Sequence, residues 1–191
     1  PNGMYRVGAL ARLNIAKACG TPIADKELKK FKALNDGKPV LNSFYYHYAR
    51  LIEIIYGIEK IEELLNDEAT MSDNIKISSN VSQTKGVGCS EAPRGTLFHD
   101  YEVTKDGVIT SVNLIIATGN NSLAMNAGVK QVAQTFVDSE DITDGALNRV
   151  EAVIRCFDPC LSCSTHALGI VSSKIEVRDK DKNLLKVIDR N

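Results

Sequence analysis

Apolar residues recur at helical spacing through the first half of the chain and predict its longest element. From Ser43, a candidate N-cap, apolar side chains return every three or four positions: Tyr48, Leu51, Ile55, Ile58, Ile61 and Leu65. This period is that of one face of an α-helix, so we expect an amphipathic helix over 43–66. A shorter polar helix is predicted over 25–34, where "DKELKKFKAL" is closed by the turn-forming "NDGKP".

Strand-like patterns follow in two places. "YEVT" and "VITSVNLIIA" flank Lys105-Asp106-Gly107, a hairpin signal, so strands are expected within 101–117. "SKIEVRDKDKNLLKVID" (173–189) alternates around a charged turn and predicts a second hairpin. The passage over 78–100 is rich in glycine and is expected to hold a loop that leads into the first strand.

Two further helices are predicted between these hairpins. One spans 122–137 with Ser122 as its cap, and the other spans 144–157. The second ends at Asp158-Pro159, because a residue before proline avoids the α region. Its apolar face is expected to comprise Leu147, Val150, Ile154 and Phe157.

These elements predict a mixed, helix-rich α+β fold, with the 43–66 helix as its spine and the 101–117 hairpin beside it. Neither an internal repeat nor a low-complexity linker marks a domain boundary. The 191 residues, 43% of them hydrophobic, suffice for one or two ordinary cores.

Charge and composition narrow the classes of function. The 23 basic and 24 acidic residues leave a formal charge of −1, without a basic patch for nucleic acid. No apolar run approaches the roughly 20 residues of a membrane helix. No export signal opens the sequence, so a cytoplasmic location is expected. Because the chain enters hydrophobic sequence without a starting Met, we expect a fragment or a processed product.

Three cysteines and a histidine lie close together in "CFDPCLSCSTH" (156–166). Cys160 and Cys163 are spaced to grip one metal ion, and zinc, iron–sulfur and dithiol redox sites all use such pairs. Zinc held by this pair with Cys156 and His166 is one alternative, although structural zinc usually draws its ligands from two separated knuckles. Three buried cysteines without a metal are another, since Cys is among the most buried residue types.

A second unusual stretch is "SEAPRGTLFHD" (90–100), in which Pro93 and Gly95 flank Arg94. Proline fixes the approach of the chain, and glycine permits close backbone contact. An arginine held in this way can project rigidly over a site as a donor that keeps its proton. On its own, Arg94 could equally form a surface ion pair.

Together these stretches resemble the large (alpha) subunit of [NiFe]-hydrogenases. "FDPCLSCSTH" is similar to that family's C-terminal metal motif D-P-C-x-x-C-x-x-H, and "SEAPRGTL" resembles its arginine loop. "YRVGALARLN" (5–14) resembles its "VGPLAR" stretch, with Ala9 in place of proline, and "IIATGNN" (115–121) is similar to "VVPSTWN". The resemblance spans essentially the whole chain and is nearest to cytoplasmic enzymes coupled to F420, dyes or NAD.

The resemblance implies a nickel–iron centre whose iron carries cyanide and carbon monoxide. Cys160 would be a terminal nickel ligand, and Cys163 would bridge nickel to iron, which suits a soft thiolate. His166 would coordinate a magnesium ion. Cys156 falls outside the motif and is expected to be structural.

The resemblance also assigns catalytic and supporting roles. Arg94, fixed or partnered by Asp158, would lie over the open edge of the metals and help polarise H2 for heterolytic cleavage. Pro93, Ala117 and Thr118 would shape the pocket around the diatomic ligands of iron, with the Thr118 hydroxyl donating to a cyanide nitrogen.

His99 matches a histidine that follows the family's arginine loop. An indirect role at the metal centre and plain packing are both open for it.

One departure limits the resemblance. The family completes its nickel site with another C-x-x-C, but Cys19 and Cys89 belong to no such pair, and the glutamate that relays the proton is also absent. We therefore expect residues 1–166 to be the C-terminal portion of a large subunit, inactive alone. Its partners would be an iron–sulfur small subunit and the N-terminal part of the same large subunit.

The remaining residues, 167–191, fit the extension that a nickel-dependent endopeptidase removes from family precursors. The expected cleavage point lies between His166 and Ala167, so the sequence is read as unprocessed. Two rival functions are a complex I type scaffold relative, which Cys160 and Cys163 argue against, and an unrelated zinc or dithiol module.

Overall fold

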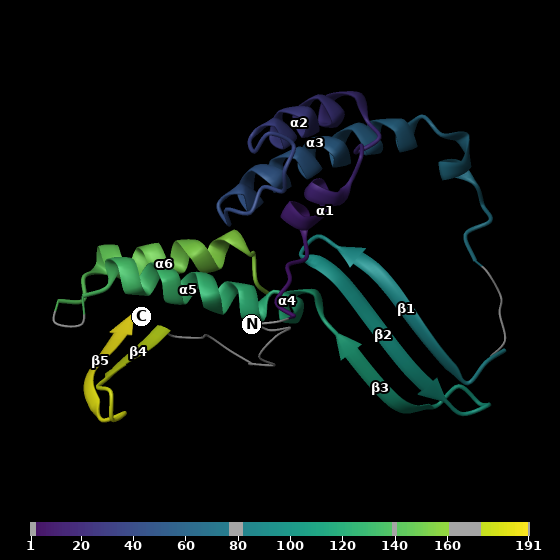
Figure 1. The fold of residues 1–191 in the computed structure, drawn as a ribbon. Coiled ribbons are helices and arrows are strands. Elements are labelled where there is room, and N and C mark those ends of the chain that lie inside the picture. The colour runs from purple at the N-terminus through teal and green to yellow at the C-terminus, as the bar shows by residue number, and fades with distance from the viewer. Residues whose placement is uncertain (1–2, 77–81, 139–140, 161–172, 191) are drawn as a thin grey trace.

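The computed structural model describes residues 3–76, 82–138, 141–160 and 173–190 (Figure 1). Over these residues it contains a mixture of helices and strands, which confirms the predicted α+β class. In chain order the elements are α1 (Ala9–Ile15), α2 (Pro22–Ala33), α3 (Tyr45–Leu65), the short 3₁₀ helix η1 (Glu68–Met71), β1 (Lys85–Ala92), β2 (Gly95–Val103), β3 (Ile109–Ile115), α4 (Ala117–Asn120), α5 (Ser122–Phe136), α6 (Asp144–Cys156), β4 (Ser173–Arg178) and β5 (Leu184–Arg190).

The elements form four groups, three of which meet near the start of the chain, whereas the C-terminal hairpin lies apart from that junction (Figure 1). Helices α1 and α2 pack against α3, and α5 packs along α6. Strands β1, β2 and β3 form an antiparallel sheet in that order, which contacts α4 through β2. The predicted C-terminal hairpin is confirmed as the antiparallel pair β4–β5.

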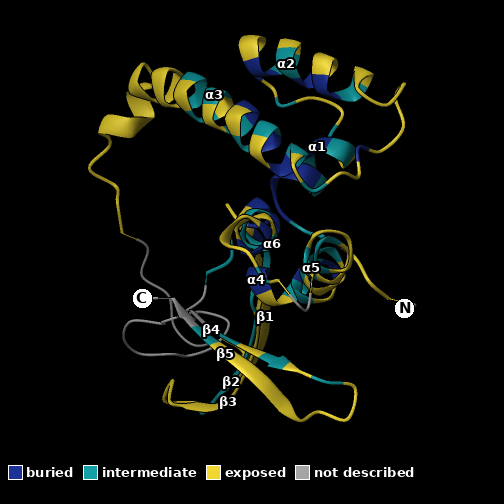
Figure 2. Ribbon diagram, turned by 90° about the vertical axis from the view of Figure 1, so that its left-hand side faces the viewer, coloured by how far each residue is buried: buried dark blue, intermediate teal, exposed yellow. Residues whose placement is uncertain are grey.

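The main core lies between α1, α2 and the first half of α3, and it continues to the end of α6 (Figure 2). Tyr46 joins the two parts: its ring centroid lies 5.1 Å from that of Phe157, and its hydroxyl donates to the Val7 carbonyl at 2.9 Å. Burial raises the pKa of Tyr46 to about 12, so it is a neutral donor at physiological pH. Arg50 adds a hydrogen bond of 2.9 Å to the carbonyl of Cys156.

Helix α3 exists as predicted, but its cap and its buried face differ from the prediction. Phe44 rather than Ser43 precedes the first helical residue, without a capping side chain. The face buried against the core carries Tyr46, Ala49 and Ile52. Much of the predicted apolar face is exposed instead. Leu51 lies on the side of the helix away from the buried residues, and the second half of the helix, with Ile58, Ile61 and Leu65, extends beyond the described core.

The sheet is larger than the predicted hairpin. The glycine-rich passage contributes β1, whose eight residues pair with β2 from Lys85↔Glu102 to Ala92↔Gly95. All but the last residue of β1 are exposed, so the strand is held by its backbone ladder and shows no apolar alternation. Strand β3 ends at Ile115, and the residues expected to prolong it form α4.

Helices α5 and α6 lie close to their predicted ranges. Asn121, not Ser122, precedes α5, and its side chain accepts a hydrogen bond from the Val7 amide instead of capping the helix. Helix α6 ends at Cys156, before Asp158-Pro159, as expected. Of its predicted apolar face, Leu147 and Phe157 are buried, whereas Val150 and Ile154 are only half-buried.

In the part of the chain that the structure describes, no helix combines the length and apolar character needed to cross a membrane.

Candidate metal centre

A cavity of about 170 Å³ lies where three separate segments meet. These are the β1–β2 turn, the junction of β3 with α4, and the chain just after α6. Five of the residues predicted for the site line it: Pro93, Arg94, Ala117, Thr118 and Cys160. Its lining comprises Ala92, Pro93, Arg94, Leu97, Ile116, Ala117, Thr118 and Cys160.

Arg94 and Asp158 are in contact at the edge of this cavity. The Nε of Arg94 donates to the backbone carbonyl of Asp158 at 2.8 Å, and it lies 3.4 Å from the Oδ2 of the same residue. Asp158 has a φ of 48°, a left-handed conformation that follows the end of α6 and precedes Pro159. The Asp-Pro break thus turns the backbone so that a carbonyl and a carboxylate both face the guanidinium.

Thr118 connects the β3–α4 junction to the cysteine segment. Its side chain is buried, with 6% exposure, and its hydroxyl oxygen accepts a hydrogen bond from the backbone N–H of Cys160 at 3.2 Å. A hydroxyl has one proton to donate and can accept two bonds. The contact therefore positions Cys160 and leaves the hydroxyl proton of Thr118 for another acceptor.

The cysteines differ sharply in their surroundings. Cys156 is fully buried, its thiol donates to the Ala152 carbonyl at 3.2 Å, and burial raises its pKa. Such a thiol is a structural residue rather than a ready thiolate. Cys160 is disulfide-bonded in the structure, so metal binding requires its reduction first. The predicted ligands Cys163 and His166, and the cleavage point at Ala167, lie outside the described residues.

The donors around the cavity fit part of a soft metal site. Cys160 supplies a thiolate when reduced, which favours nickel or iron over magnesium, and the cavity is otherwise largely apolar. Across the described ranges, no three His, Cys, Asp or Glu side chains gather closely enough to hold a metal ion. Among the described residues, Cys160 is therefore the one candidate ligand at this cavity, with Arg94 and Thr118 as polar residues beside it.

His99 does not line this cavity. It lies on β2, with its Nδ1 3.3 Å from the Tyr101 hydroxyl, in a separate open depression of about 290 Å³. Leu97 borders both hollows. His99 follows it by two residues on β2 and lines only the second one. Cys89 belongs to the same depression, and Cys19 lines a third hollow.

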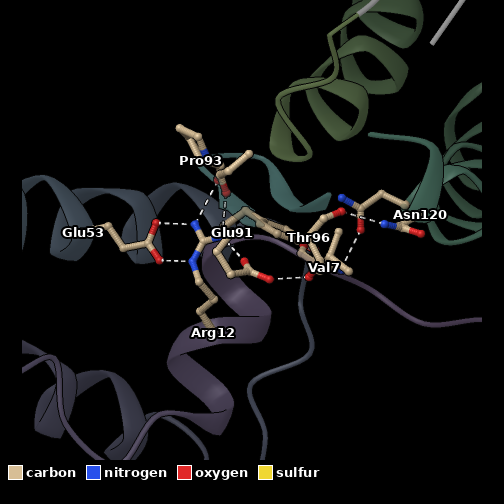
Figure 3. A network of polar contacts seen from close by, with 10 residues as sticks. Val7, Arg12, Glu53, Glu91, Pro93, Thr96 and Asn120 are labelled. Atoms are coloured by element: carbon tan, nitrogen blue, oxygen red, sulfur yellow. Dashed lines mark hydrogen bonds and ion pairs between the residues drawn. The ribbon is translucent and has the colours of Figure 1, made fainter. Parts of the chain in front are cut away.

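Residues just before α1 pack against the turn that holds Arg94, and the sequence patterns did not predict this contact (Figure 3). Tyr5 donates to Oδ1 of Asn120 at 2.6 Å, and Nδ2 of Asn120 donates to the Thr96 carbonyl at 2.9 Å. A Cβ on Gly95 would lie 2.2 Å from Cγ2 of Val7, so only glycine fits there. These contacts join the Thr96 carbonyl to side chains that no sequence pattern marked, so the glycine was their one signal in the sequence.

Comparison with known proteins links this arrangement to one family. A family model described as nickel-dependent hydrogenase matches residues 2–166. The NAD-reducing hydrogenase HoxS subunit beta of Cupriavidus necator is 39% identical over 186 residues, covering 96% of this chain and 38% of that protein. The sulfhydrogenase 2 subunit alpha of Pyrococcus furiosus is 33% identical over 163 residues, with coverages of 84% and 38%.

A solved structure shows the same likeness in three dimensions. The crystal structure of an NAD+-reducing [NiFe]-hydrogenase in the H2-reduced state superposes with a TM-score of 0.80 at 41% identity, covering 87% of this chain and 37% of that one. The chain thus spans less than two-fifths of the length of each of these relatives.

Proposed function

Because the chain belongs to the nickel-dependent hydrogenase family, we propose that it forms part of the catalytic large subunit of a [NiFe]-hydrogenase, which oxidises H2 reversibly. The observation that carries this proposal is the cavity that Arg94, Thr118 and Cys160 line together. Three motifs far apart in the sequence converge on it, and each is a motif by which the chain resembles the family.

The proposed cofactor is a nickel–iron centre with cyanide and carbon monoxide on iron, which supplies the two-electron chemistry at H2 when bound. In this proposal Cys160 and Cys163 hold it, and His166 holds a magnesium ion. Thr118 keeps the Cys160 backbone in place and has a hydroxyl proton left for a ligand in the cavity.

Arg94 and Asp158 are the proposed catalytic residues of this chain. The guanidinium stays protonated, so it acts as a fixed positive charge at the rim of a small, largely apolar cavity. A preorganised charge in such a place stabilises developing negative charge without reorganisation at the moment of reaction. Asp158 orients that charge through its carbonyl and balances it through its carboxylate.

The proposed setting follows the same resemblance. The N-terminal part of the large subunit would supply the missing thiolates, and an iron–sulfur small subunit would carry the electrons. Residues 167–191 would be removed after His166 by a nickel-dependent endopeptidase, in the cytoplasm. Until then, and without its partners, the chain is expected to be inactive towards H2.

Substituting Cys160 in the complete large subunit, once it is assembled with its small subunit, tests the proposal. Cys160→Ser should abolish nickel binding and H2 oxidation, because an alcohol is a poor substitute for a soft thiolate. Cys89→Ser, an exposed cysteine on β1, is the matched control and should retain both. Elemental analysis measures nickel and iron per large subunit, and full nickel with full activity in Cys160→Ser would refute the proposed site.

A further inference from the structure

Arg12, on α1, uses every N–H of its guanidinium (Figure 3). Its Nε and one Nη2 proton bind the two carboxylate oxygens of Glu53, both at 2.7 Å. Nη1 donates to Glu91 and to the carbonyl of Ala92, each at 2.9 Å. The second Nη2 proton reaches the Pro93 carbonyl, also at 2.9 Å. A guanidinium has five such protons, and all are satisfied here.

Two of these acceptors are the backbone carbonyls directly before Arg94. The carboxylates hold Arg12 from both sides, since Glu53 comes from α3 and Glu91 from β1. Glu91 also accepts a hydrogen bond from the hydroxyl of Thr96, across the same hairpin. Arg12 therefore joins the helical core to β1 directly, and to β2 through the Glu91–Thr96 hydrogen bond.

The backbone of α1 touches the turn at the same place. The amide of Arg12 donates to the Gly8 carbonyl at 2.9 Å, and a Cβ on Gly8 would lie 2.8 Å from the carbonyl oxygen of Arg94. Gly8 brings the start of the helix against the Arg94 carbonyl, and Arg12, one helical turn later, binds the two preceding carbonyls. An α1–α3 ion pair alone would need only Glu53, whereas the bonds to Ala92 and Pro93 restrain the turn itself.

We infer that Arg12 is a positioning residue that holds the Pro93–Arg94 turn so that the Arg94 guanidinium stays over the metal cavity. This inference rests on the proposed function of Arg94. Lysine cannot replace Arg12, because a single ammonium cannot span two carboxylates and two carbonyls in the plane that the guanidinium occupies. Arg12→Lys keeps the positive charge, so any effect of this substitution comes from the lost hydrogen-bond geometry and not from a change of charge.

A double-mutant cycle in the assembled, metal-loaded enzyme separates positioning from general stability. Arg12→Lys should lower kcat about tenfold with KM for H2 little changed, since small displacements of a catalytic group are costly. Nickel and iron per large subunit should stay at the wild-type level. In an Arg94→Lys background, the further loss from Arg12→Lys should be less than about twofold, because coupled residues are not additive.

Arg155→Lys is the matched control, since Arg155 is exposed and pairs with Glu151 on its own helix, α6. It should leave kcat and metal content unchanged. Hydrogen–deuterium exchange gives a readout without turnover: Arg12→Lys should speed exchange in the peptide that spans 90–97, whereas Arg155→Lys should not.

The outcomes separate this inference from the proposed function. Equal losses from Arg12→Lys in both backgrounds, loss of metal, or an unchanged kcat would each overturn the positioning role. If Arg94→Lys itself leaves a metal-loaded enzyme fully active, the proposed role of Arg94 fails instead. Should Arg12→Lys not assemble, Glu53→Gln loosens Arg12 with little change of volume and must show the same loss of additivity with Arg94→Lys.

Discussion

At the scale of single residues, two glycines with nearly the same positive φ can be compared. Gly8 has φ +93° and Gly20 has φ +91°, but a Cβ on Gly8 would meet the Arg94 carbonyl at 2.8 Å, whereas Gly20 has open space. Gly20→Ala should lower the unfolding free energy by about 1–2 kcal/mol, because alanine is strained at a positive φ. Gly8→Ala should cost about 1–3 kcal/mol more, because its ψ of −166° suits only glycine and because the backbone must also move apart.

Urea unfolding of both variants measures this difference. Equal losses would show that the turn can retreat from α1 freely, which would contradict the close packing around Arg94. In the assembled enzyme, Gly8→Ala should also lower the rate of H2 oxidation, while Gly20→Ala should not.

Individual site residues could be predicted from the sequence where they belong to a recognisable motif. Arg94, Thr118 and Cys160 were identified from three separate stretches, and the structure places them around one cavity. Arg12 was present in a recognised stretch but without a role. Two of its partners are backbone carbonyls, which every residue has, so their use cannot be seen in the letters.

At the scale of elements, the N-terminus of α2 is capped by a side chain from α3. Glu59 accepts hydrogen bonds from the Thr21 hydroxyl at 2.7 Å and from the amides of Ile23 and Ala24 at 2.8 and 2.9 Å. Burial alone would raise the pKa of Glu59, but these bonds to the charged form outweigh it and lower the pKa.

This lowered pKa makes part of the stability depend on pH. The stabilisation is present above the pKa of Glu59 in the unfolded chain, near 4.5, and is lost as the pH falls through the lower folded value. Glu59→Gln should therefore be less stable than wild type at pH 7, and the gap should close towards pH 3. Glu62→Gln, at an exposed site on the same helix, is the control; thermal unfolding across pH 3–7 checks both. A gap that does not change with pH would contradict the capping role.

The elements themselves were largely predictable, but their faces were not. Helical spacing of apolar residues located α3, α5 and α6, because this local pattern indicates a helix whatever the helix packs against. The predicted apolar stripe of α3 was only partly its buried face, since tertiary packing decides which apolar side chains of a helix meet the core. Strand β1 was missed because its pairing uses the backbone, and its exposed side chains carry no alternation.

At the scale of the whole molecule, the second half of α3 is largely exposed (Figure 2), and several of its exposed residues are apolar. This α3 patch has exposed fractions between 50% and 76%, and it comprises Ile54, Ile58, Ile61, Leu64 and Leu65. Contiguous apolar surfaces of this kind mark interfaces. The chain covers only 38% of the HoxS subunit beta, so the proposed large subunit has ample further chain to cover the patch.

The fold class could be predicted at this scale, because secondary-structure content follows from local patterns. The patch could not be distinguished from a core stripe in the sequence, since both consist of apolar residues at helical spacing. Their difference lies in what packs against them. Of the predicted stripe, Tyr48 and Ile55 pack against the core, whereas Ile58 and Ile61 do not.

The isolated chain is therefore expected to self-associate through the α3 patch. Ile58→Glu with Ile61→Glu should shift it towards monomer, because burying two carboxylates in an apolar contact costs more than the contact stabilises. Ile15→Glu with Leu34→Glu, which are exposed outside the patch, should leave the association unchanged. Size-exclusion chromatography with light scattering, over a range of concentrations, measures the mass. A wild-type chain that stays monomeric, or equal effects of the two pairs, would show that the patch is not the contact surface, and the rest of the large subunit would then have to dock elsewhere.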